Sequence, residues 1–180
     1  MNDTAKDVID FWQEAGPERW FQGGEAFDAE CGRRFFDLHM AASRGELADW
    51  PENAPGALAL VLLLDQIPRN VFRGSAHAYA TDPLARAVAN SAISSGHDRS
   101  YETELRAFFY MPFMHSEAMP DQKRCVALFA DLPGSASAPW ATHHHEVIKR
   151  FGRFPHRNTV LGRMTTSEEQ TWLDEGGFTG

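Results

Sequence analysis

The chain has 180 residues, of which 43% are apolar, 12% aromatic and 23% charged. This mixture excludes a disordered segment, which would be poor in aromatic residues, and it fits one globular domain over residues 1–180 with a substantial core. The net charge of −8 argues against nucleic-acid and anionic-membrane partners. The acid is uneven, because residues 1–60 hold 12 acidic and 5 basic residues, a net charge of −7.

Eight helices are predicted from the apolar spacing and the helix-stop residues. In chain order they cover about residues 8–15, 25–44, 55–64, 82–96, 100–111, 120–132, 139–152 and 165–176. Gly16-Pro17 is expected to stop the first helix and Pro112 to break or kink the chain after the fifth, whereas Gly45 and Gly152 are expected to close the second and the seventh. No segment alternates convincingly between apolar and polar residues. The sequence therefore predicts an all-α fold of helical hairpins packed in series, without a clean fixed-period repeat.

Three of these helices carry more specific predictions. Residues 57–64 are apolar all round, which predicts a central, buried helix. Thr81 or Asp82 before Pro83 predicts the start of the fourth helix. Two overlapping capping boxes, Thr165 with Glu168 and Thr166 with Glu169, predict the start of the last one.

The chain start and the cysteines bear on the cellular setting. The first residues have neither the basic region nor the apolar core of a secretory signal. The longest apolar run, residues 57–64, is far shorter than the roughly 20 residues of a membrane helix. Cys31 and Cys125 lie in apolar helical segments without metal-ligand spacing, so we expect two buried reduced thiols and a cytoplasmic protein without membrane association.

The first polar segment, residues 64–74, continues directly from the buried helix. Asp65 is expected to face the interior, where a carboxylate needs a partner, and Arg69 four residues later can supply it. Pro68 deprives the Leu64 carbonyl of its helical donor, so this helix end either holds a ligand or is closed by its own polar side chains. The candidate ligand-binding residues here are Asp65, Gln66, Arg69, Asn70 and Arg73.

The second segment, residues 110–117, brings His115 and Glu117 after a proline-interrupted aromatic helix. A histidine beside a carboxylate can transfer protons, although His-x-Glu alone is a weak signal and a hydrogen-bonded core histidine also fits it. Both residues are candidates for the site.

The third segment, residues 140–158, contains three consecutive histidines. Neighbouring residues on a helix point about 100° apart, so three in a row cannot hold one metal ion. Only His144 shares a face with Trp140 and Val147, which predicts that it points inward while its neighbours meet solvent. Residues 144–163 hold five basic residues and one acid, a local charge of +4. The candidates here are His144, Arg150, Arg153, His156, Arg157 and Asn158.

Long strings in these segments carry a family resemblance. They are residues 64–74 (LDQIPRNVFRG), 110–117 (YMPFMHSE), 150–158 (RFGRFPHRN) and 161–163 (LGR). With similar residues at both ends, nearly the whole chain resembles the bacterial domain-of-unknown-function 924 family. The resemblance implies a helical, tetratricopeptide-like arrangement of antiparallel helix pairs. It implies no catalytic residue, because the family's activity is unsettled, but the family pattern has a histidine at the position of His144.

These observations lead to two functional hypotheses from different classes. The first is a polar Arg/His/Asp pocket for a small anionic ligand, with His144 or His156 as acid or base if the protein is an enzyme. The alternative is a tetratricopeptide-like module that binds a protein or peptide partner without catalysis, because stacked helix pairs form concave surfaces.

Two further interpretations remain open at this point. A metal enzyme ranks last because no metal-ligand spacing is present, and no cofactor is expected. The same side chains could instead be internal struts, with arginines neutralising Asp65, Glu117 and the acidic first third. The discriminating observation is whether Asp65, His115, Glu117, His144 and His156 meet in one cleft.

Overall fold

The computed structural model describes residues 4–177, and in this range the regular structure is helical throughout, without a strand. The longer helices are α1 (Ala5–Gln22), α2 (Gly24–Ser43), α3 (Ala54–Val61), α5 (Asp82–Ser94), α8 (Met119–Ala130), α9 (Ala138–Phe151) and α10 (Ser167–Asp174). Shorter helical turns are η1 (Trp50–Glu52), η2 (Leu62–Gln66), α4 (Ile67–Val71), η3 (Ala76–Tyr79), η4 (His97–Ser100), α6 (Thr103–Arg106), η5 (Ala107–Phe109), α7 (Met111–Met114) and η6 (Pro155–Arg157). The all-α prediction is confirmed.

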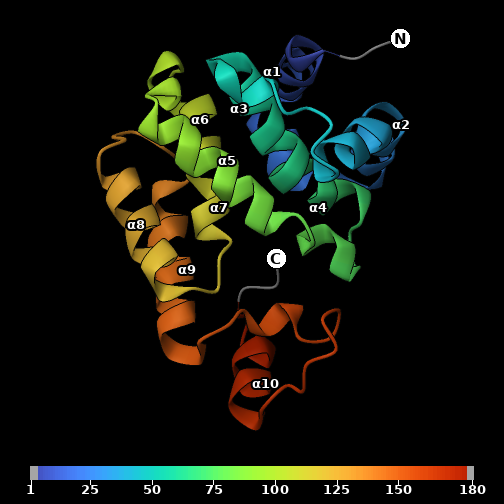
Figure 1. The fold of residues 1–180 in the computed structure, drawn as a ribbon. Helices are drawn as coiled ribbons and strands as arrows, with labels where there is room; N and C mark the ends of the chain where they lie inside the picture. Colours follow the sequence, from blue (N-terminus) through green and yellow to red (C-terminus); the bar gives the residue numbers. More distant parts are fainter. Residues whose placement is uncertain (1–3, 178–180) are drawn as a thin grey trace.

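Helix α3 lies at the centre of the core, as its sequence predicts. Its residues from Gly56 to Val61 are all buried, and it packs against α1 and α5 (Figure 1). On α1, Trp12 is fully buried, with its ring 6.0 Å from Phe27 and 5.6 Å from Phe108. Burying aromatic rings of this size from three separate segments is a major source of stability, about 1.5–3 kcal/mol for each fully buried large apolar side chain.

Local sequence signals set several helix ends. Gly152 adopts the left-handed conformation, with a φ of 70°, and closes α9, so the chain turns sharply there. Thr166 and Glu169 form a reciprocal capping box at the start of α10. Of the two overlapping boxes, only this one forms, because the Thr165 hydroxyl accepts from the Asn158 amide.

Three predicted elements differ from the structure. Gly16 breaks the first helix with a φ of 72°, but helical turns resume at Pro17 and continue to Gln22. The single helix expected over residues 100–111 is instead a series of short turns, and Pro112 lies in the first turn of α7 rather than after a helix. Thr81 precedes α5 without capping it, because its hydroxyl bonds elsewhere.

The polypeptide after Gly152 is set apart from the rest. We call residues 152–177 the C-terminal lobe and residues 5–151 the helical body; Figure 1 shows the lobe, with α10 in red, below the body. Cys31 and Cys125 are free and buried, as predicted. Among the helices of residues 4–177, none combines the length and apolar character that crossing a membrane requires.

Candidate functional site

The site begins at a widened helical turn that follows α3. Residues Leu62–Gln66 form a π turn, in which the Ile67 amide bonds the Leu62 carbonyl. Such turns occur frequently at functional sites. Pro68 has no amide hydrogen to donate, so the carbonyls it would have served need other donors. Side chains far along the chain supply them.

Two such side chains close this helix end. His39 Nδ1 lies 2.8 Å from the Leu63 carbonyl, and the Thr81 hydroxyl donates to the Leu64 carbonyl at 2.6 Å. The sequence predicted the unserved Leu64 carbonyl correctly, but its partner is Thr81 and not a residue of the same segment.

Asp65 points inward from the π turn onto His115. The Asp65 side chain is completely buried, and its two oxygens lie 2.9 and 3.0 Å from His115 Nδ1. Burial opposes ionisation of Asp65, but Arg69 and His115 outweigh it and hold the Asp65 pKa below its usual range. Because an ionised carboxylate only accepts hydrogen bonds, His115 Nδ1 carries the hydrogen and Nε2 has the lone pair. The pair has the arrangement of a histidine positioned by a carboxylate.

Arg69 links this pair to a second buried carboxylate. Its guanidinium donates to both oxygens of Asp82, at 3.0 and 3.1 Å, and lies 3.3 Å from an Asp65 oxygen. The expected Asp65–Arg69 pairing is therefore present. Asp82, considered from the sequence only as a helix start, is an unanticipated member of the site.

A row of rings continues from His115 into the C-terminal lobe. The ring centroids of His115 and His144 are 6.4 Å apart, those of His144 and Phe154 5.3 Å, and those of Phe154 and His156 5.6 Å. His144 is buried and its Nδ1 donates to the Trp140 carbonyl, while His143 is exposed, as the helical-face argument predicted for both. Burial lowers the pKa of His144 and of His156 to about 3, so both are neutral at neutral pH.

Arg157 lies where the lobe meets the body. Its Nη1 donates to the His115 carbonyl at 3.0 Å, and its guanidinium carbon lies 4.4 Å from the ring centroids of both Tyr79 and Phe154. Its closest carboxylate atom is an Asp82 oxygen at 3.8 Å, beyond hydrogen-bond distance, and its buried Nε has no hydrogen-bond partner among residues 4–177. Burial and the neighbouring Arg69 lower the Arg157 pKa to about 10, which leaves it charged at neutral pH.

The remaining polar residues of the third segment form a network within and beneath the lobe. Arg163 donates to both oxygens of Glu117, at 2.7 and 3.0 Å. Arg153 likewise donates to both oxygens of buried Glu169, at 2.6 and 2.8 Å. Fully buried Asn158 joins the two pairs, because it accepts from Arg163 and donates to Glu169. Each of these arginines thus has a carboxylate of its own.

Four candidates lie at the edge of the site or outside it. Gln66 Nε2 donates to Asp65 at 2.7 Å, and the Asn70 amide donates back to the Gln66 carbonyl. Arg73 turns away to Asp28 on α2, with bonds of 2.6 and 2.9 Å, and Arg150 pairs with Glu168 on the surface.

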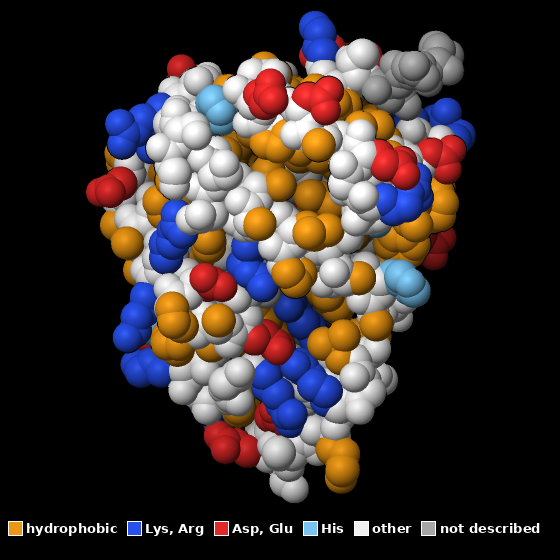
Figure 2. Space-filling view, viewed as in Figure 1, with side chains coloured by type: hydrophobic (Ala, Val, Ile, Leu, Met, Phe, Trp, Pro, Cys, Tyr) orange, Lys and Arg blue, Asp and Glu red, His pale blue; other side chains and the backbone are white. Residues whose placement is uncertain are grey.

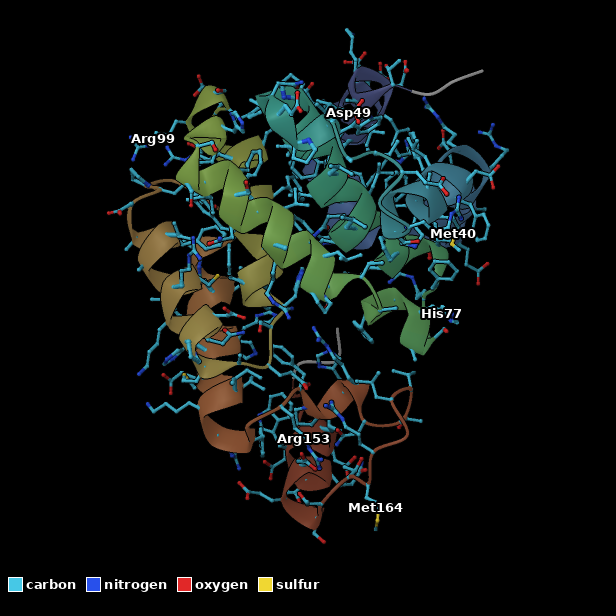
Figure 3. All side chains as sticks on the ribbon, viewed as in Figure 1. Met40, Asp49, His77, Arg99, Arg153 and Met164 are labelled. Carbon is cyan, nitrogen blue, oxygen red and sulfur yellow. The ribbon has the colours of Figure 1, made fainter. Side chains whose placement is uncertain are left out.

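Figure 2 shows Lys and Arg side chains gathered in a hollow between the helical body and the C-terminal lobe. Figure 3 shows side chains from both parts reaching into this space, with His77 at the edge of the body and Arg153 inside the lobe. The five residues named as the discriminating set lie along this junction. They do not meet at one point but form a continuous row of contacts that passes through Phe154, whose amide donates to Glu117 at 2.8 Å.

Other features of the described residues bear on the competing hypotheses. In residues 4–177, no three His, Cys, Asp or Glu side chains are arranged to hold a metal ion. An open surface cavity of about 420 Å³ lies on a different part of the body, lined among others by Trp20, Tyr101 and Glu104. None of the candidate residues lines it.

The sequence reasoning missed four members of the site: His39, Tyr79, Asp82 and Glu169. His39 had a signal, because it lies four residues after Phe35 in the predicted helix over residues 25–44 and so shares a face with that aromatic residue. Glu169 was visible only as a capping residue. Tyr79 carried no signal at all, because its place beside two arginines depends on packing.

The comparisons with known proteins agree with this architecture. The family model described as "Bacterial protein of unknown function (DUF924)" matches residues 8–177. The chain belongs to the DUF924 family. It is also similar to a solved structure, the protein of unknown function ATU0120 from Agrobacterium tumefaciens, at 52% sequence identity, with 96% of this chain and 97% of that chain covered and a TM-score of 0.92. No curated protein matches the sequence. The resemblance expected from the strings is thus confirmed, and the DUF924 match brings no activity with it.

Proposed function

We propose that this DUF924 protein binds a small anionic molecule at Arg157, at the junction of the helical body and the C-terminal lobe. His115, His144 and His156 would line the same site. The anion would carry a carboxylate or a similar oxyanion group, because a planar guanidinium recognises such groups through paired hydrogen bonds.

One observation carries the proposal: Arg157 is the exception among the six arginines of the four strings that carry the family resemblance. The other five each donate to a carboxylate within 3.1 Å; they are Arg69, Arg73, Arg150, Arg153 and Arg163. Arg157 is 6% exposed and has a carbonyl, two aromatic faces and a carboxylate oxygen only at 3.8 Å. Arg157 therefore has hydrogen-bond donors that the described residues leave unused, among them its buried Nε, and the oxygens of an anion would accept from them.

The surroundings favour binding of an anion over a merely structural role. The guanidinium carbon lies 4.4 Å from the centroids of two rings, which restrict its position but provide no carboxylate for its N–H groups. The site is poor in water contact, so each charge-assisted hydrogen bond is stronger there than at the surface. The neutral histidines beside it each have one ring N–H that donates a hydrogen bond and one ring nitrogen that accepts one.

The experiment is thermal denaturation with and without acetate or sulfate. A ligand that binds only the folded state at 100 times its Kd adds about 2.7 kcal/mol of stability. For a chain of this length, we expect a Tm increase of about 5–10 °C. The variant Arg157→Met keeps the apolar stem between Tyr79 and Phe154 and should lose the increase.

The matched control is Arg73→Met, which removes an arginine that already has Asp28 as its partner. It should keep the wild-type response to both anions. An equal anion response in Arg157→Met and in the wild type, or no response in the wild type, would contradict the proposal.

The alternative is the tetratricopeptide-like interaction module. The large exposed apolar side chains include Phe21, Trp140 and Met164, which belong to α1, α9 and the loop before α10. Because they are distributed over separate elements, they favour the module less than Arg157 favours the anion site. The two buried free thiols are in keeping with a cytoplasmic setting, which stays a prediction.

A further inference from the structure

The charges buried around Arg157 cancel before any ligand arrives. Two carboxylates, Asp65 and Asp82, face two guanidinium groups, Arg69 and Arg157. With the histidines neutral, the sum is zero. An added monoanion would leave one negative charge in excess in a buried place, which is unfavourable unless a positive charge appears with it.

Histidine is the residue type that can supply this charge near neutral pH, but burial lowers the pKa of His144 and His156 to about 3. Of the three histidines in the ring series, His115 is therefore the one best placed to take up a proton. Its Nδ1 already lies between the two Asp65 oxygens, so a counter-ion for the protonated ring is in position. Its backbone carbonyl accepts from Arg157 Nη1, so the anion-binding guanidinium lies next to this residue.

We propose that the anion enters together with one proton, which binds to Nε2 of His115. This inference rests on the proposed function and deepens it. The imidazole gains a proton from water at Nε2, keeps its Nδ1 hydrogen bond to Asp65, and then donates from Nε2 toward the bound oxyanion. Asp65 is the positioning residue, and the ligand class is the anion of a weak acid, taken up with a net charge of zero.

The charged and titratable groups that face His115 determine the pH dependence. They are Asp65 on η2, Arg69 on α4, Asp82 on α5, His144 on α9, and His156 and Arg157 on η6. Burial, followed by Arg69, lowers the His115 pKa, while Asp65 opposes this shift. The ring is therefore neutral in the free protein at neutral pH, and the nearby anion raises its pKa. Protonation and anion binding strengthen each other by the same factor.

The test measures the Kd of acetate by NMR, from the shift of the Arg157 Nε–H signal between about pH 6 and about pH 8.5. Acetate is fully ionised throughout this range, so it contributes no proton of its own. Between the His115 pKa of the free protein and that of the complex, the Kd should rise by up to about tenfold per pH unit, which corresponds to one proton taken up per anion. Saturating acetate should raise the pKa of the His115 ring by at least one unit, and this pKa is measured by NMR in the same samples.

Variants separate linkage from binding itself. His115→Gln should bind acetate with a Kd that no longer changes with pH. The control His77→Gln removes an exposed histidine at the edge of the body and should keep the tenfold dependence. If Asp65→Asn folds, its acetate Kd should depend less on pH than that of the wild type. If Asp65→Asn does not fold, the result for His115→Gln alone tests the proposal.

The failures of the two proposals are distinguishable. Binding with the same Kd at every pH, or an unchanged pH dependence in His115→Gln, overturns the proton uptake and leaves the anion site intact. An absence of any acetate effect on Arg157 at every pH overturns the proposed function, and the proton inference with it.

Discussion

The junction around Arg157 and the network inside the C-terminal lobe use the same residue types with different results. In the lobe, Arg153 and Arg163 each grip one carboxylate with two hydrogen bonds, and Asn158 ties the two pairs together. At the junction, Arg69 takes both oxygens of Asp82 and leaves Arg157 with a carbonyl and two rings. The comparison shows that most arginines of such a motif can be paired with carboxylates inside the protein while one arginine keeps hydrogen-bond donors that a ligand could use.

The largest loss of stability is expected from substitution of Arg69, at the junction. Arg69→Met would leave Asp65 and Asp82 buried without their main cation, and breaking a buried pair on one side costs about 3–5 kcal/mol. We expect a loss of this size in the free energy of unfolding from urea denaturation. Arg73→Met, whose side chain is 61% exposed, should lose less than about 1 kcal/mol. A comparable loss in the two variants would show that the junction pairs are no more important than surface pairs.

A smaller effect is expected inside the lobe at Arg153. Arg153→Met leaves Glu169 with its Thr166 and Asn158 bonds, so we expect a loss in the free energy of unfolding at neutral pH that is clearly smaller than that of Arg69→Met. The Arg153 hydrogen bond lowers the Glu169 pKa to about 2, so this stabilisation is complete above the ordinary glutamate pKa and is lost as the pH falls toward 2. The difference between wild type and variant should therefore shrink in acid. Urea denaturation at several pH values measures it, and a difference independent of pH would exclude the ion pair as its source.

The smallest effect on stability is expected at Arg157. Arg157→Met removes a buried charge that has no hydrogen-bonded carboxylate, and Asp82 keeps both of its bonds to Arg69. We expect a change within about 1 kcal/mol of zero without anion, because replacing poorly compensated buried charge by apolar groups is often neutral. If Arg157→Met lowers the free energy of unfolding as much as Arg69→Met does, the role of Arg157 is structural, like that of Arg153.

The fold was largely predictable because its signals are local. Gly152, the capping box at Thr166 and the uniformly apolar residues 57–64 each determine structure within one or two turns. The Asp65–Arg69 pairing was predictable for the same reason, because the two residues are four apart. The broken helix over residues 100–111 was missed because packing of its aromatic residues, and not helical periodicity, decides its shape.

The partners of the other polar residues could not be read from the sequence. His115 meets Asp65 from 50 residues away, and Arg163 meets Glu117 from 46. The sequence contains several arginines and several carboxylates, and it does not show which arginine pairs with which carboxylate. Only the packing of the lobe on the body selects the pairs. The identity of the arginine left without a carboxylate is a result of that selection.

The π turn at Leu62–Gln66 has a consequence for how this site could arise and be lost. A π turn holds one residue more than the α-helical turn it replaces, and each residue of an α-helix rotates the chain by about 100°. Removing a single residue within the turn would restore a regular helix and swing Asp65 away from His115, while the apolar stretch before it stayed in register. The Asp65–His115 pair thus depends on the number of residues in this turn. A relative that lacks one residue there would lose the pair even if it kept every polar side chain.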